Sequence, residues 1–297
     1  MAAAALWRVR ADGHERLARG PVDTGPTELL AEGLTVDDLL AGSAGTLEYV
    51  LDGPAAGGLP AGATVLAPAA GQEIWCAGVT YLRSRDARIG ESVSSADHYE
   101  QIYHAERPEL FLKMAPGRVR GPGEVIGVRA DSGWDVPEPE LAAVADRRGR
   151  VVAYTIGNDV SSRSLEGENP LYLPQAKVYT GSCAVGPCLV PVGRAPDHTQ
   201  MRIRLTIARD GEAIYTDSVS ASDMYRTPQD LVDWLYRATD FPVGAVLLTG
   251  TAIVPEPEFT LRGGDEVTIE ITGLGRLRNT VEVVGATQEP AAGKASG

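Results

Sequence analysis

Cysteine is scarce in this chain, which has three (Cys76, Cys183 and Cys188) among its 297 residues. Three cysteines so far apart cannot form a disulfide framework, and their spacing matches none of the usual zinc-binding patterns. We therefore expect all three to be buried as small apolar side chains.

The sequence also has no basic run and no long apolar run. Lysine and arginine number 27 against 40 acidic residues, which argues against a nucleic-acid-binding surface and is compatible with bound divalent cations. No apolar stretch approaches the roughly 18 residues of a membrane-spanning helix, and the opening MAAAALWRVRADG lacks a signal-peptide pattern. We expect a cytoplasmic protein with no nucleic-acid or membrane partner.

Turn residues and polar clusters divide the chain into three parts. Residues 1–70 predict a small N-terminal domain, with short strands at LWRVRA and LEYVL and a helix at TVDDLLAG, from Thr35 to Gly42. Residues 71–287 are patterned mostly as strands, with one clear helix at TPQDLVDWLYRAT, and residues 288–297 as a disordered tail. The long polar stretch before LFLKM, with helical spacing in SADHYEQIYHAE, is typical of a lid over a site.

The stretch WDVPEPELAAV places two carboxylates side by side. Glu138 and Glu140 are two residues apart in an extended segment, so their side chains share a face. Asp159 follows 19 positions later, and the turn in ADRRGRVV allows the two strands to pair and bring the three acids together. Such hard oxygen ligands suit Mg²⁺, with Mn²⁺ or Ca²⁺ as alternatives. On this spacing alone, the glutamates could equally face solvent.

Several separated motifs resemble the fumarylacetoacetate hydrolase family. The family has a Glu-x-Glu pair on a strand, then an Asn-Asp-Val-[Ser/Thr]-x-Arg segment, and this chain has Glu138, Glu140 and NDVSSR from Asn158 to Arg163. The C-terminal run from LLTGTA to RLRNTV is also similar, and the likeness covers about residues 71–285. The resemblance implies a mostly β, α+β fold with a mixed β-roll or barrel, a metal site at the three acids, and a homodimer or homotetramer.

Within that family, AERPELFLK and LEGENPLYLPQAKVY are similar to the 2-keto-3-deoxy-D-arabinonate or xylonate dehydratase branch. This likeness implies a metal-dependent hydro-lyase that converts a 2-keto-3-deoxy sugar acid to 2,5-dioxopentanoate. Two positions depart from the branch, because Ser164 and Thr180 stand where it usually has aspartate. The alternatives are a hydrolase, decarboxylase or tautomerase of another 2-keto or 1,3-dicarbonyl acid, and a metal-binding homologue without catalysis.

The resemblance also implies roles for individual side chains. Lys177 stands at the family's active-site lysine. Glu109, Glu106 and His98 are acid–base candidates, the histidine by pairing with Glu91 or Glu106. The substrate-binding candidates, in the order of the chain, are Arg83, Arg85, Tyr179, Thr180 and Thr251, and Lys113 is a strand residue that could face the site. Ordinary surface or turn positions are the alternative for each of these residues.

The implied chemistry follows from what a 2-keto acid offers to a metal. Its carboxylate and C2 carbonyl oxygens can chelate the ion, which as a Lewis acid stabilises the enolate formed when a C3 proton is removed. A C4 hydroxyl can then leave as water. Because the enolate is common to C–C hydrolysis, decarboxylation and tautomerisation, the pattern predicts the metal step better than the product.

Overall fold

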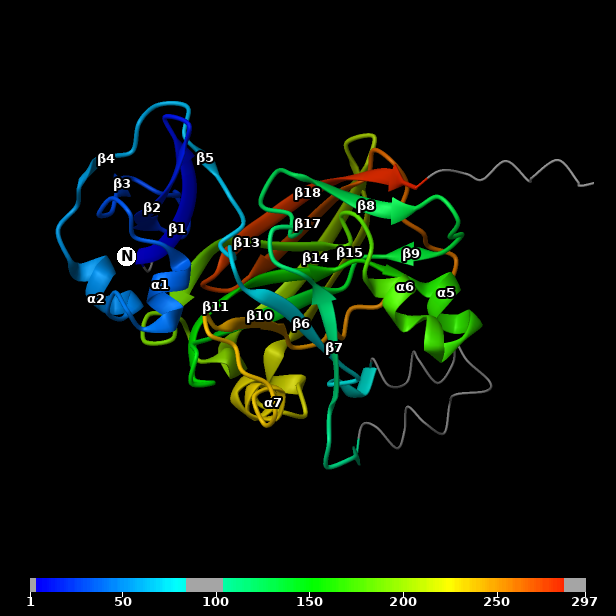
Figure 1. The fold of residues 1–297 in the computed structure, drawn as a ribbon. Helices are drawn as coiled ribbons and strands as arrows, with labels where there is room; N and C mark the ends of the chain where they lie inside the picture. Colours follow the sequence, from blue (N-terminus) through cyan, green and yellow to red (C-terminus); the bar gives the residue numbers. More distant parts are fainter. Residues whose placement is uncertain (1–3, 84–103, 286–297) are drawn as a thin grey trace, which may run out of the picture.

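A long mixed sheet is the main feature of the computed structural model, which describes residues 4–83 and 104–285 (Figure 1). Its strand order is β4-β3-β2-β1-β13-β11-β10-β16-β6-β7, and β5 also pairs with β1. In that order the strands are Gly57–Gly58, Glu28–Leu29, His14–Pro21, Ala4–Ala11, Cys183–Pro191, Val151–Asp159, Pro139–Ala145, Ala245–Leu248, Glu73–Gly78 and Glu109–Met114, with β5 at Thr64–Val65.

A second sheet packs against the first. Its order is β15-β14-β17-β18-β8, formed by Glu212–Ser220, Arg202–Arg209, Glu266–Ile271, Gly275–Val284 and Val125–Arg129. A short pair joins β9 (Asp135–Val136) to β12 (Ser161–Ser162). The mostly β fold is as predicted, but none of the sheets formed by the described residues closes into a barrel, because each ends in strands with one partner.

Five α-helices and three short 3₁₀ turns connect the strands of the described chain. They are α1 (Val36–Ala41), α2 (Leu47–Asp52), α5 (Arg163–Glu168), α6 (Leu173–Lys177), α7 (Pro228–Leu235), η1 (Pro170–Tyr172), η2 (His198–Gln200) and η3 (Ala221–Asp223). The predictions of α1, capped by Thr35, and α7, capped by Thr227, are confirmed. None of these helices has the length and apolar character needed to span a membrane.

The strand predicted at LEYVL is wrong, because these residues form α2. The Thr46 side chain caps the helix by accepting a hydrogen bond from the Tyr49 backbone. Leu47 and Leu51 are both 3% exposed, whereas Tyr49 is 74% exposed. In a strand all three would share a face, so the exposed tyrosine is explained only by the helical period.

The two faces of the long sheet carry different cores. One face, with Leu141, Ile156 and Val190, belongs to the same apolar cluster as Ile203 and Ile269 of the second sheet. The other face has its own cluster, which includes residues of α1 and α2 together with Ile74, Cys76, Ala142, Val144 and Leu248. This second face is the one on which the candidate site lies.

The predicted hairpin of β10 and β11 is confirmed. The strands pair antiparallel with Pro139 opposite Asn158 and Glu140 opposite Gly157. The N-terminal strands are continuous with this sheet, because β1 pairs with β13 through Leu6 and Leu189. The division at residue 70 stays a prediction, and the predicted tail, 288–297, and most of the lid lie outside the described residues.

Candidate functional site

The three predicted acids come together at the end of the β10–β11 hairpin. Glu138, Glu140 and Asp159 are 4%, 1% and 1% exposed. The backbone N–H of Asp159 donates to the Glu138 carbonyl at 3.0 Å, so Asp159 lies opposite Glu138 and diagonal to Glu140. Residues paired in this way share a face of the sheet, as the spacing predicted.

Buried cations surround two of these acids. Lys177, at the end of α6, donates to Glu138 Oε2 at 2.8 Å, Asp159 Oδ2 at 2.8 Å and Ser161 Oγ at 2.6 Å. An ammonium has three N–H donors, so these acceptors use all of them. The lysine is therefore held as a cation between two carboxylates, which favours the role of charge stabiliser over that of free base.

Two further cations complete the group. Lys113 of β7 is fully buried, forms an ion pair with Asp159 and donates to the Val160 carbonyl at 2.9 Å. Arg163, the last residue of the NDVSSR motif, contacts Glu138 Oε1 at 3.1 Å. The second carboxylate oxygens of Asp159 and Glu138 are thus fixed as well, so both acids are oriented from two sides.

Glu140 has a different environment, with a backbone donor in place of a cation. Its Oε2 accepts from the N–H of Gly250, which follows β16. Burial, and then the charges of Asp159 and Glu138, raise the pKa of Glu140 well above its ordinary range. A buried carboxylate repelled by its neighbours is charged at neutral pH only if a further cation compensates it, so the donor set fits a divalent ion of hard character.

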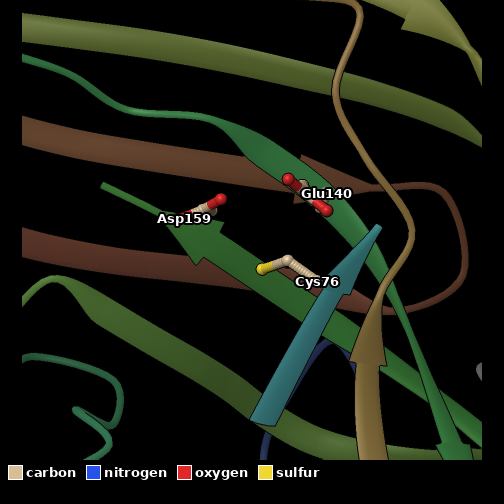
Figure 2. A group of neighbouring side chains, drawn as sticks. All are labelled: Cys76, Glu140 and Asp159. Atoms are coloured by element: carbon tan, nitrogen blue, oxygen red, sulfur yellow. The ribbon is translucent and has the colours of Figure 1, made fainter. Parts of the chain in front are cut away.

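The thiol of Cys76 completes the closest group of potential metal ligands in the described residues. Its sulphur and one carboxylate oxygen each of Glu140 and Asp159 all lie within 4.8 Å of one another. Figure 2 shows the three side chains converging from β6, β10 and β11. Burial, and then the charges of Asp159 and Glu140, raise the pKa of the thiol well above its usual value. All three cysteines are buried as predicted, but Cys76 also faces the acids.

Of the two glutamates proposed for acid–base chemistry, Glu109 lies on the face of the site. It begins β7 and pairs with Gly78 of β6, and a Cβ built on Gly78 would lie 2.0 Å from Glu109 Oε2. Gly78 and Cys76 are two residues apart on one strand, so this carboxylate lies on the face that carries the thiol. Glu106 is exposed, and its backbone carbonyl accepts a hydrogen bond from the Arg226 side chain at 3.0 Å.

The threonine of the TGT motif is next to the Glu140 contact. Thr251 is 4% exposed, and its Oγ1 accepts from the Ile253 backbone at 3.2 Å. Tyr179 is also buried, and among the described residues its hydroxyl has no hydrogen-bond partner. Thr251 thus follows the glycine that binds Glu140, and Tyr179 follows Lys177 by two residues and also lines a small surface cavity with Arg129.

Two of the other substrate-binding candidates, Thr180 and Arg83, are not brought to the acids. Thr180 is exposed and lines a small surface cavity of about 160 Å³ together with Arg129 and Asp131. The Arg83 side chain is 55% exposed and pairs with Asp217 of β15 at 2.8 Å. Arg85, His98 and Glu91 lie outside the described residues.

Comparison with known proteins identifies the family. The model of the fumarylacetoacetate hydrolase C-terminal domain matches residues 73–282. The chain belongs to the fumarylacetoacetate hydrolase family. The matched span includes every strand that contributes to the site, from β6, which carries Cys76, to β16.

The family's curated members include two similar proteins. The chain is 53% identical over 217 residues to a probable 2-keto-3-deoxyxylonate dehydratase of Haloferax volcanii, covering 73% of this chain and 74% of that protein. It is 42% identical over 213 residues to the 2-dehydro-3-deoxy-D-arabinonate dehydratase of Saccharolobus solfataricus, covering 71% and 72%. Both likenesses fall in the branch that the motifs AERPELFLK and LEGENPLYLPQAKVY indicated.

A solved structure of this family extends the likeness to the whole fold. The structure of a 2-keto-3-deoxy-D-arabinonate dehydratase complexed with magnesium and 2,5-dioxopentanoate matches with a TM-score of 0.80 and 33% identity. The match covers 95% of this chain and 99% of that one. The likeness therefore extends beyond the residues matched by the family model into the N-terminal strands.

Proposed function

We propose that this protein is a Mg²⁺-dependent dehydratase of a 2-keto-3-deoxy sugar acid, such as 2-keto-3-deoxy-D-arabinonate, with 2,5-dioxopentanoate as product. The observation that carries the proposal is the buried acid group of Glu138, Glu140 and Asp159 with Lys177 fixed beside it. The two dehydratases that are 53% and 42% identical support the reaction. Hydrolysis of a C–C bond has support only from the name of the family.

Glu140, Asp159 and Glu138 would hold the magnesium ion. When bound, the ion supplies Lewis-acid stabilisation of negative charge on the substrate's keto-acid oxygens. Lys177 and Lys113 fix the Asp159 carboxylate, and Arg163 and Lys177 fix that of Glu138, so neither ligand has to be ordered during the reaction. The sugar acid's own C4 hydroxyl is the leaving group.

Glu109 is the side chain best placed to move a proton. Its carboxylate lies over Gly78, on the face of β6 that carries Cys76, and it belongs to the AERPELFLK motif. We assign it the transfer of a proton between C3 and the departing hydroxyl. A positioned carboxylate of this kind contributes about 10²–10⁴-fold to a rate.

The direct test is to incubate the purified protein with Mg²⁺ and 2-keto-3-deoxy-D-arabinonate and to detect 2,5-dioxopentanoate by mass spectrometry. We expect turnover by the wild type and by E168Q, whose residue is exposed on α5. E140Q and E109Q should each lose at least about 100-fold of the rate. Turnover of oxaloacetate or an acylpyruvate, with none of the sugar acid, would contradict the proposal.

The proposal includes an oligomer, because the family resemblance implies a homodimer or homotetramer. Light scattering of the purified protein at micromolar concentration measures its mass directly. A mass near 31.3 kDa, that of one chain, would contradict this part of the proposal.

A further inference from the structure

The closest donor group in the site is not made of oxygens alone. Cys76 lies within β6 and is 1% exposed, with β16 on one side of the strand and β7 on the other. Its sulphur and one carboxylate oxygen each of Glu140 and Asp159 all lie within 4.8 Å of one another, and we call these three residues the 4.8 Å group (Figure 2). Glu138 is not a member of this group, and its two oxygens contact Lys177 and Arg163.

Sulphur and oxygen donors select different ions. Mg²⁺ binds carboxylate and water oxygens and has little affinity for sulphur, whereas thiolate ligands select Zn²⁺ and other soft or borderline ions. Zinc–sulphur and zinc–oxygen bonds are about 2.3 and 2.1 Å long, so in a tetrahedral site a sulphur and an oxygen ligand lie about 3.6 Å apart. The three ligand atoms lie within 4.8 Å of one another, so side-chain movements of about an ångström would bring them to the spacing of a single mixed site.

We propose that Zn²⁺ and Cd²⁺ bind at this position through the sulphur of Cys76 together with Glu140 and Asp159, in competition with Mg²⁺. On binding, the S–H bond is broken, a metal–sulphur bond forms and the proton passes to the solvent. The competition rests on the proposed function, because it concerns the same acids that would hold Mg²⁺. The site would then be inhibited by thiophilic ions, which keep Glu140 and Asp159 from the magnesium.

Cys183 provides a matched control. It is buried like Cys76, and its backbone lies directly opposite Asp159 in the pairing of β11 with β13, so it belongs to the same face. It is nevertheless not a member of the 4.8 Å group. The geometry therefore assigns the metal–sulphur bond to Cys76, although both thiols are near Asp159.

The test is a titration of the full-length protein with Cd²⁺ alone, followed by the ultraviolet sulphur-to-metal charge-transfer band. We expect the band to reach its maximum at one equivalent of Cd²⁺ in the wild type and in C183S, and to be absent in C76S. Thermal melting followed by circular dichroism checks that each variant is folded. A band that persists in C76S, or disappears in C183S, would overturn the proposal.

If C76S does not fold, the wild type and E140Q still test the proposal. Added Mg²⁺ should lower the apparent Cd²⁺ affinity in proportion to its concentration, and E140Q should weaken Cd²⁺ binding at least tenfold. If the wild type shows no charge-transfer band, or if Mg²⁺ does not change the band, Cd²⁺ and Mg²⁺ do not compete for one site and the proposal is refuted. No sugar acid is present in this titration, so its outcome is independent of whether the protein is a dehydratase.

Discussion

At the scale of single residues, buried carboxylates in this protein differ in what neutralises them. Asp159 and Glu138 each contact two cations, whereas Asp135 in β9 forms no ion pair within residues 4–83 and 104–285. Asp135 is 2% exposed, and its Oδ1 has no hydrogen-bond partner among the described residues. Burial raises its pKa to about 6, well above the ordinary value.

We predict that D135N is more stable than the wild type at pH 8 and equally stable at pH 4. The pKa of Asp135 is higher in the folded protein than its ordinary value of about 3.9. The contribution of this carboxyl to the stability of the fold is therefore fully present below about pH 3.9 and is lost as the pH rises through about 6. Asparagine has a similar shape without the charge. Melting temperatures across this range measure the effect, which should reach several degrees at pH 8.

D131N is the control with the opposite sign. Arg129 binds the Asp131 carboxylate and lowers its pKa, so this charge stabilises the fold above the ordinary pKa and the benefit is lost in acid. Because Asp131 is 63% exposed, D131N should change the melting temperature little, and downward at pH 8. A lower melting temperature of D135N than of the wild type at pH 8 would contradict the prediction.

At the scale of elements, the end of β16 links the sheet to the acids. Gly250 has φ +93°, a conformation that other residues rarely adopt, and its N–H binds Glu140. A Cβ at this position would lie 2.0 Å from Thr80 Oγ1 and 3.1 Å from the Ala77 carbonyl. Thr80 cannot turn away freely, because its hydroxyl donates to the Thr249 carbonyl at 2.6 Å.

We predict that G250A destabilises the protein and weakens Mg²⁺ binding, because the displaced loop no longer positions Glu140. The control is G211A in the β14–β15 turn, where φ is +83° but a Cβ would have nothing within 4 Å. Positive φ alone costs about 1–2 kcal/mol, so G250A should lose more than that. Chemical denaturation and calorimetric Mg²⁺ titration measure the two effects, and equal losses in both variants would refute the role of Gly250.

Local patterns predicted some elements and not others. The caps of α1 and α7 and the β10–β11 hairpin depend on residues close in sequence, so they were found correctly. The strand β15 was not predicted, since its residues are mostly partly exposed or exposed and it depends on pairing with β14. The helices α5 and α6 were also missed, because their short sequences contain Gly167 and Pro174.

The site was predictable to the extent that one hairpin and a family motif determine it. Spacing placed Glu138, Glu140 and Asp159 on one face, and the motif indicated Lys177. The place of Cys76 in the acid group could not be read from cysteine spacing, because it depends on β6 lying beside β16 and β16 beside β10. The sequence indicated Arg163 only as part of a family motif. Its contact with Glu138 was not predicted, because it depends on where α5 lies relative to β10.

At the scale of the whole molecule, repulsion between the buried carboxylates of the site destabilises the fold, and a bound cation reduces this repulsion. We predict that EDTA lowers the melting temperature of the wild type relative to protein in Mg²⁺. A ligand at 100 times its dissociation constant stabilises a fold by about 2.7 kcal/mol, which corresponds to several degrees for a chain of this size. Differential scanning calorimetry with and without Mg²⁺ measures the shift.

E140Q is the informative variant in the same experiment. It removes a proposed ligand and one buried charge, so its melting temperature should respond little to Mg²⁺. E168Q, which changes an exposed glutamate, should keep the full response of the wild type. An equal Mg²⁺ response in E140Q and the wild type would show that the ion stabilises the protein from another place.

The pairing of β6 with β16 has a consequence for how the protein acquires its site. These strands are parallel, with Cys76 opposite Leu248, so their pairing closes a loop of more than half the chain. Contacts of such high sequence separation form slowly and late in folding. During synthesis, the hairpin that carries Glu138, Glu140 and Asp159 emerges well before Gly250. The acid group is therefore complete only after β16 has joined the long sheet, so metal binding would report that this late pairing has formed.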